Sequence, residues 1–417
     1  MWTILLSLIA CDPADQIDGR DDGQSSTDSV TYYADVQPLL EKHCTRCHVE
    51  DGLGVGDFTD TNLLTSFAPS MLASIDAGRM PPAAADPGCN DYVGSDALTI
   101  SPDERDVLEA WIAADMPMGD PADAPTLEPI SGELSDPDMV MMMPAAYTPT
   151  FEDTVNPGNE YRCFLLDKPT DEAFYITSMA PVIGNNALVH HAVLFTLSQN
   201  RITDAMRDPN GVNCIDGMGP DVTTGMIGAW APGMLPVEFP DDAGMLVGAN
   251  QAVVLQMHYY AAADDGTQSD QSGYAFKTTD EVDTQVLMAP IADYSFIIPA
   301  GDDNFKTTES LTNTFTDGDI LGTFPHMHVL GRRFDAKIIH EDGTETCLVA
   351  GDYDFDNQMT YMFSEPVPFN RGDTLEFSCT WNNSTSNPDR YFDEPQDTSF
   401  GERTNEEMCY YFTLVTL

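Results

Sequence analysis

The sequence has very little positive charge. Only 17 lysine and arginine residues stand against 69 aspartate and glutamate residues, and the formal net charge is −52. Such a surface repels the phosphates of nucleic acids, so we expect no nucleic-acid partner. It also repels anionic lipid headgroups, which argues against electrostatic docking on a membrane. The simplest interpretation of the charge is a solubilising surface.

Long apolar runs are missing as well. Past the N-terminus, no segment approaches the roughly 20 apolar residues that a membrane-spanning helix needs. Residues 1–11 are apolar up to Cys11, and Leu8-Ile9-Ala10-Cys11 resembles the lipobox of bacterial lipoproteins. The segment is short and lacks basic residues, so a chance cysteine is the alternative. We expect an exported protein, periplasmic or on the cell surface, whose only membrane attachment is a possible lipid anchor on Cys11.

Residues 44–48, Cys-Thr-Arg-Cys-His, contain the attachment pattern of c-type haem. In this pattern two thiols bond to the haem vinyl groups, and the following histidine coordinates the iron. A redox-active thiol pair is the alternative, but the adjoining histidine and the helical context disfavour it. We therefore predict one covalently bound haem c, held by Cys44, Cys47 and His48.

The sixth ligand of such a haem is usually a methionine further along the chain. Met80 is followed by two prolines, Pro81 and Pro82, which form a rigid turn. We predict Met80 as this ligand. Its competitors are Met71, Met116 and Met118.

Composition divides the chain into a helical part and a longer β-rich part. Residues 12–30 have almost nothing to bury and are typical of a disordered acidic linker. Residues 31–118 show helical spacing, with Ser101 as a helix cap before Glu104–Ala114, and predict a small all-α, cytochrome c-like domain. Residues 119–145 are rich in proline, aspartate and glycine, which indicates a second linker.

Beyond residue 145, short segments rich in β-branched and aromatic residues alternate with turn residues. The predicted strands include Ala173–Thr177, Leu188–Leu197, Ala252–Tyr260, Ala336–His340 and Thr374–Thr380. This pattern is typical of antiparallel sandwiches or barrels. The length of the region suits two β domains better than one.

Six cysteines lie outside Cys11 and the haem motif. In an exported protein they are disulfide candidates, although their pairing cannot be read from the sequence. They are Cys89, Cys163, Cys214, Cys347, Cys379 and Cys409.

Histidine is scarce, yet five of the eight histidines fall in three groups of the β region. They are His190 and His191, His258, and His326 and His328. Imidazole-rich sites without thiolates favour copper or zinc, with iron as a further option. A single histidine among apolar residues is more often a hydrogen-bonded core residue, but the clustering of five favours metal binding.

Strand geometry predicts how these histidines point. Residues at i and i+2 share a face, so His326 and His328 can bind one ion while Met327 points away. The adjacent His190 and His191 point to opposite faces, and one metal takes both only at a bulge or a strand end.

Six segments of the β region carry a resemblance to a known family. They are Tyr161–Phe164, Val189–His191, Gly228–Gly233, Gln256–His258, His326–His328 and Glu406–Cys409. With these segments the chain resembles the copper type II, ascorbate-dependent monooxygenases, the group of peptidylglycine α-hydroxylating and dopamine β-monooxygenases. The resemblance implies two jelly-roll-like all-β sandwich domains, at residues 146–283 and 284–417.

The resemblance also implies two copper ions. It assigns the electron-storing copper to His190, His191 and His258. It assigns the oxygen-binding copper, where the chemistry takes place, to His326, His328 and Met408. Among 21 methionines only the resemblance singles out Met408, although a thioether beside two imidazoles suits Cu(I).

The family further places a disulfide between the positions of Cys379 and Cys409. Cys163 with Cys214 is a weaker assignment, and the pairing of Cys89 and Cys347 stays open.

Three positions depart from the peptide-hydroxylating members. Phe324 stands where those enzymes have an arginine that binds the peptide carboxylate. Tyr410 and Phe412 replace an asparagine and a tyrosine. Peptide amidation is therefore not expected, and the replacements favour a more apolar or neutral substrate. No carboxylate is singled out as the partner of an amine substrate.

We therefore expect a copper-dependent monooxygenase that hydroxylates a C–H bond of a small organic substrate with O₂. Ascorbate or a redox protein would supply electrons one at a time, with the fused cytochrome as the feeder. The alternative is a non-catalytic exported electron-transfer or copper-binding protein. A haem-based sensor would leave the histidine groups unexplained.

Overall fold

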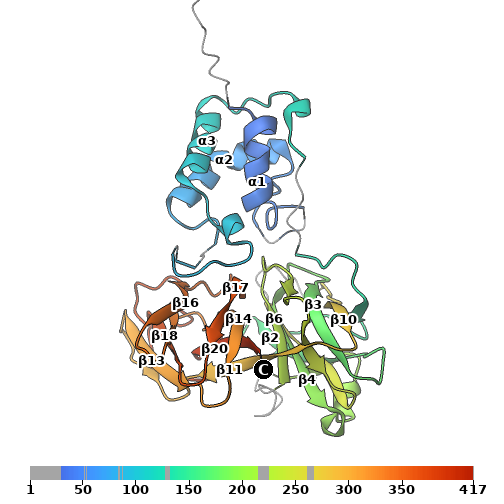
Figure 1. Cartoon of the computed structure of the whole chain (residues 1–417). Coiled ribbons are helices and arrows are strands. Elements are labelled where there is room, and N and C mark those ends of the chain that lie inside the picture. Colours follow the sequence, from blue (N-terminus) through green and yellow to red (C-terminus); the bar gives the residue numbers. More distant parts are fainter. Residues whose placement is uncertain are drawn as a thin grey trace, which may run out of the picture.

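The computed structural model describes residues 30–50, 52, 54–82, 85–86, 88–126, 132–214, 225–260 and 267–416. Cys11 and the linker up to residue 29 lie outside these residues. A helical region precedes two β sandwiches, and it lies over the junction between them (Figure 1). None of the described helices is both long and apolar enough to cross a membrane.

The helical region contains three α-helices. They are α1 (Gln37–His43), α2 (Thr61–Asp76) and α3 (Pro102–Ala113), accompanied by the short helical turns η1 (Tyr32–Val36), η2 (Ser95–Leu98) and η3 (Pro121–Asp123). Helix α3 begins as predicted, because Ser101 and Glu104 cap each other reciprocally. Its Leu108 and Trp111 pack with Leu40 and Leu64 in a small core of the helical region.

The first β sandwich contains two sheets. One has the order β1 (Met139–Met142), β10 (Gly273–Thr279), β3 (Phe174–Val182), β8 (Ala243–Val247), with β7 (Val237–Glu238) also paired to β3. The other has the order β5 (Val212–Asn213), β2 (Asn159–Leu166), β9 (Gln251–Tyr260), β4 (Val189–Ser198), β6 (Met226–Trp230). The turns η4 (Gln199–Arg201) and η5 (Ala205–Arg207) follow β4.

The second sandwich is built in the same way. One sheet has the order β11 (Thr284–Ala292), β20 (Tyr410–Thr416), β14 (Gly318–His326), β17 (Tyr361–Phe369). The other has the order β13 (Phe305–Thr312), β18 (Thr374–Trp381), β15 (Gly331–Ile339), β16 (Glu345–Asp352). The short pair β12 (Ile297–Ile298) and β19 (Thr398–Ser399) stands apart from both.

One sheet runs through both sandwiches. Strand β8 pairs in parallel with β11 through Ala243 with Thr284 and Gly244 with Gln285. The buried apolar side chains of the two sandwiches form one continuous cluster. The sandwich architecture and its position after the helices agree with the expectation from sequence, and each of the five named strand predictions overlaps a strand. The expected linker at 119–145 differs in one respect, because its residues 139–142 form β1.

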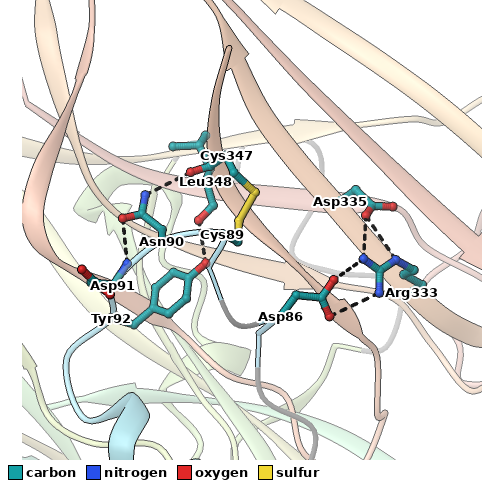
Figure 2. The surroundings of a disulfide bond; sticks show 9 residues. All are labelled: Asp86, Cys89, Asn90, Asp91, Tyr92, Arg333, Asp335, Cys347 and Leu348. Carbon is teal, nitrogen blue, oxygen red and sulfur yellow. Dashed lines mark hydrogen bonds and ion pairs between the residues drawn. A yellow bond between two sulfur atoms is a disulfide. The ribbon is translucent and has the colours of Figure 1, made fainter. Parts of the chain in front are cut away.

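Three disulfides are present among the described residues. Cys379 pairs with Cys409, as the resemblance implied, and Cys163 pairs with Cys214, which was the weaker assignment. The pairing left open by the sequence is Cys89 with Cys347, which links the helical region to β16 (Figure 2). Disulfides persist in oxidising compartments, which supports an extracellular location.

The chain around Cys89 runs along the second sandwich for several residues. Asn90 donates to the carbonyl of Cys347 over 3.0 Å, and the hydroxyl of Tyr92 donates to the carbonyl of Leu348 over 2.8 Å (Figure 2). Arg333 of β15 forms an ion pair with Asp86. The helical region is therefore fixed to the β region by one covalent bond and several polar contacts.

Candidate metal and cofactor sites

A β-bulge brings three histidines together. The register of β4 against β9 shifts between Val189 and His191, at the two adjacent histidines. His190 and His191 consequently approach each other, with their Nδ1 atoms 3.0 Å apart. The Nδ1 atom of His258, on β9, lies 3.4 Å from that of His191. The bulge that strand alternation required for a shared site is therefore present.

The outer nitrogens of two of these rings have partners. Nε2 of His258 lies 2.8 Å from the side-chain oxygen of Asn159, and Nε2 of His190 lies 3.3 Å from the carboxylate of Asp356. A ring that donates from Nε2 keeps the lone pair of Nδ1, and here these Nδ1 atoms face the interior of the cluster. Tyr161 stacks on His258 with ring centroids 4.1 Å apart.

The cluster fits a bound metal ion in its chemistry. Burial, assisted by the neighbouring imidazoles, lowers the pKa of His191 and of His258 well below the ordinary histidine value. Neutral imidazole is the form that binds metal. His190, His191 and His258 form a group whose ligand atoms lie within 4.8 Å of one another.

The second pair of histidines lies at the end of a strand. His326 is the last residue of β14, and His328 lies just beyond the strand. Their ring centroids are 5.3 Å apart, and Met327 between them is fully buried. The two imidazoles are therefore close together, as positions i and i+2 predicted.

The Nδ1 atoms of this pair are engaged. Nδ1 of His326 lies 2.6 Å from the side-chain oxygen of Gln358, and Nδ1 of His328 lies 3.0 Å from the carbonyl of Glu406. Nε2 of each ring is then the nitrogen with a lone pair. Burial lowers the pKa of His326 to about 4 and that of His328 to about 3, so both are neutral at physiological pH.

Both groups of histidines reach one small apolar cavity. Its volume is about 100 Å³, and His191, His326, His328 and Met408 line it. The rings of His191 and His326 are 6.2 Å apart across the junction of the two sandwiches. Its other walls are mostly apolar, including Trp230, Phe324, Phe412, Met226 and Tyr410.

The three departures from the peptide-hydroxylating pattern meet at this cavity. Phe324 lies 5.9 Å from Phe412, and Tyr410 stacks on Phe412 at 5.2 Å, measured between ring centroids. The exposed carboxylate-bearing residue Glu402 also lines the cavity. The sequence alone did not single out Glu402 or any other carboxylate as the partner of an amine substrate.

A larger cavity lies between the helical region and the β region. Its volume is about 470 Å³, and its walls include Cys44, Cys47, His48 and Met80. Cys44 and Cys47 are free thiols. Met71, one of the competing methionines, also lines this cavity, whereas Met116 and Met118 pack in the core of the helical region.

One ring nitrogen of His48 has a hydrogen-bond partner. Its Nδ1 atom lies 3.0 Å from the carbonyl of Val55, and its ring stacks on Phe58 with centroids 4.3 Å apart. Donation from Nδ1 leaves the lone pair on Nε2. Two free thiols, this imidazole and a methionine on the cavity wall are the residue types that would hold a covalent haem.

Sequence reasoning missed the residues that orient the predicted ligands. Asn159, Gln358, Asp356 and Glu407 each touch a predicted ligand or its main chain. No short motif marks them, because each is brought to its histidine by the packing of distant strands and turns.

Comparison with known proteins gives a family. Residues 146–265 match the description "Copper type II ascorbate-dependent monooxygenase, N-terminal domain", and residues 283–415 match the C-terminal domain of the same family. The two matches together cover more than half of the chain.

Two curated relatives and one solved structure illustrate the similarity. DBH-like monooxygenase protein 2 of Mus musculus is 26% identical over 275 residues, 60% of this chain and 42% of that protein. Dopamine beta-hydroxylase of Canis lupus familiaris is 26% identical over 278 residues, 60% of this chain and 41% of that protein. The chain spans less than half of the length of either relative. The major capsid protein P2 from Bacteriophage PM2 matches with a TM-score of 0.25 and 8% identity over 62% of this chain and 97% of that one, and this likeness carries no argument.

Proposed function

Because the chain belongs to the copper type II ascorbate-dependent monooxygenase family, we propose that it hydroxylates a C–H bond of a small organic substrate with O₂. The observation that carries the proposal is the cavity of about 100 Å³ on which His191, His326, His328 and Met408 meet. Members of both groups of predicted ligands thus line one mostly apolar pocket, which would receive a small substrate and O₂.

The predicted ligands divide into two sets. His190, His191 and His258 would hold one copper ion, and His326, His328 and Met408 would hold the other. Copper held in this way supplies one-electron redox chemistry and the activation of O₂. Burial lowers the pKa of four of these imidazoles and keeps them neutral, namely those of His191, His258, His326 and His328. Asn159 orients His258, and Gln358 orients His326.

The cavity walls favour an apolar or neutral substrate. Phe324 and Phe412 present aromatic rings where a peptide-binding site would need cationic or polar groups. Their rings exclude water and fix the orientation of an apolar substrate beside His326. Glu402 is the carboxylate among the side chains that line this cavity.

We further propose that residues 31–118 form a cytochrome c-like domain. Its haem would be attached to Cys44 and Cys47, with His48 and Met80 as axial ligands. Bound haem c supplies reversible one-electron transfer. The domain would pass electrons from ascorbate or a redox protein to the copper sites. The protein would act outside the cytoplasm, with lipid attachment at Cys11 as a prediction that lies outside the described residues.

Metal analysis and oxygen uptake test the proposal together. The full-length protein should contain two coppers and one covalently bound haem iron per chain. Reduced, copper-loaded protein should consume O₂ in proportion to the hydroxylated product when small apolar substrates are screened. Copper binding without any substrate-dependent O₂ consumption across such a screen would favour the non-catalytic electron-transfer alternative.

The haem is tested by replacing its attachment residues. The double variant Cys44→Ser/Cys47→Ser of the full chain should lose the covalent haem and turn over slowly with a redox-protein donor. Turnover with free ascorbate should persist, because ascorbate can reduce copper directly. Equal loss with both donors contradicts the feeder role.

A further inference from the structure

One short segment separates the cavity of about 470 Å³ from the predicted copper ligands. It is Asp354–Gln358, between β16 and β17, and we name it the bridging segment. Asp354, Asp356 and Asn357 line the cavity of about 470 Å³. In Figure 1 the helices that form the other side of this cavity lie over the ends of the sandwiches near β6 and β17.

The bridging segment also contacts both groups of histidines. Phe355 stacks on His190 with ring centroids 4.7 Å apart, and its ring is 6.1 Å from that of His328. Gln358 holds Nδ1 of His326. The bridging segment thus contacts histidines of both sandwiches, and it lines the cavity that the helical region also lines.

Asp356 lines the cavity and also contacts the three-histidine cluster. Its carboxylate lies 3.3 Å from Nε2 of His190, and its side chain is 82% exposed because it borders the cavity. A carboxylate that accepts from the outer nitrogen of a ligating histidine fixes its tautomer and raises its basicity.

The opposite wall of the cavity approaches the same segment. Gly233 has a φ of +85° and lies near both Cys47 and Asn357. A Cβ atom added to Gly233 would be 3.5 Å from Sγ of Cys47 and 3.8 Å from the side-chain oxygen of Asn357. A haem joined to Cys47 would therefore have its attachment sulfur close to the bridging segment.

We propose that the bridging segment is the path by which electrons enter the three-histidine cluster, and that Asp356 is its positioning residue. This inference rests on the proposed haem and copper binding. In the transfer step one electron leaves a ferrous c-type haem, which becomes ferric. It reduces a cupric ion held by His190, His191 and His258 to cuprous, and no atom or proton is transferred.

The test uses the full-length protein loaded with haem and copper, without O₂ or organic substrate. The haem is reduced rapidly by a photochemical donor, and its reoxidation is followed by its absorbance while the Cu(II) signal is followed by electron paramagnetic resonance. We expect a first-order phase that is independent of protein concentration. Asp356→Ala should slow this phase about 10-fold or more. Asp356→Asn, which keeps an acceptor for His190, should restore most of the rate.

Asp354→Asn is the matched variant. It removes the charge of the other carboxylate that lines the cavity and keeps an acceptor for the main-chain N–H of Asp356. If Asp354→Asn slows the transfer as much as Asp356→Ala, the effect is the charge of the cavity and the proposed path is wrong. Unchanged transfer in Asp356→Ala also overturns it. Loss of cluster copper from Asp356→Ala but not from Asp356→Asn supports the positioning role directly.

The proposed function fails in a different way. A wild-type chain without covalent haem or copper, or without O₂ consumption with ascorbate, contradicts that function. A wild-type chain with both groups and with ascorbate-driven turnover, but with an Asp356-independent transfer, contradicts only the path.

Discussion

The main-chain N–H of His328 donates to the carboxylate of Glu407 over 2.9 Å. The same carboxylate accepts from the main-chain N–H of Met408 and from the indole N–H of Trp381. Glu407 has no exposed surface, and burial raises its pKa to about 7. One buried side chain thus holds together the two chain segments that carry the predicted ligands His328 and Met408.

Replacing Glu407 by alanine should therefore damage the site and the second sandwich together. The variant leaves the donors of His328, Leu330, Trp381 and Met408 without an acceptor in a buried place. We expect a loss of stability of about 3 kcal/mol or more, measured by denaturant unfolding of the metal-free protein. Glu406→Gln is the neighbouring control, because its partly exposed carboxylate pairs only with Arg403. Equal effects of the two substitutions would contradict the special role of Glu407.

The disulfide Cys89–Cys347 should govern how firmly the helical region is attached. The double variant Cys89→Ser/Cys347→Ser removes the covalent link in Figure 2 but keeps the contacts of Tyr92 and Asp86. We expect about 2 to 5 kcal/mol less stability and faster proteolytic cleavage within the helical region. Cys163→Ser/Cys214→Ser, in the first sandwich, should leave cleavage of the helices unchanged. Identical cleavage patterns for both double variants would show that the polar contacts suffice.

The aromatic wall of the small cavity should set the size of the substrate. Phe412→Ala removes a ring packed between Phe324 and Tyr410 and enlarges the space. We expect kcat/KM for bulkier apolar substrates to rise about 10-fold relative to the smallest accepted one. Phe315→Ala, 84% exposed and away from the cavity, is the control and should leave this ratio unchanged. An unchanged ratio in Phe412→Ala would place the substrate elsewhere.

Glu104 should make the helical region sensitive to acid. Burial opposes its ionisation, but hydrogen bonds from Ser101 and the partners His43 and Lys42 outweigh this and lower its pKa to about 2. The folded pKa lies below the unfolded value, so the stabilisation is complete above about pH 4.5 and is lost as the pH falls towards 2.

Glu104→Gln should consequently cost about 2 kcal/mol at pH 7, and the difference from the wild type should shrink between pH 4.5 and 2. Thermal unfolding of the helical region over this range measures it. Glu109→Gln removes an exposed partner of Arg105 and should change stability little at any pH. A Glu104→Gln difference that is constant with pH would contradict the assignment.

The sequence was sufficient for those features that depend on local pattern. Strand alternation required a bulge at His190 and His191, and a bulge is present. The cap at Ser101 and the named strands follow from short-range propensities. His326 and His328 lie close together, as positions i and i+2 predicted, although the strand ends at His326.

Features that depend on the docking of distant segments could not be predicted. Asp356 is one of 69 acidic residues, and only its contact with His190 distinguishes it from the others. Glu407 is recognisable only by the four donors that converge on it. Cys89 finds Cys347 because the helical region packs on β16, and no spacing rule links residues so far apart.

The cysteines of the folded protein differ in whether they form disulfides. Of the eight cysteines among the described residues, six are paired, while Cys44 and Cys47 at the haem-sized cavity stay as thiols. Burial raises the pKa of Cys44 to about 12, so almost no thiolate is present there at neutral pH. Thiolates are the species that exchange with disulfides, and an oxidising compartment therefore pairs the other six while this thiol is spared. The haem attachment proposed above would then find this thiol still reduced after the other cysteines have paired.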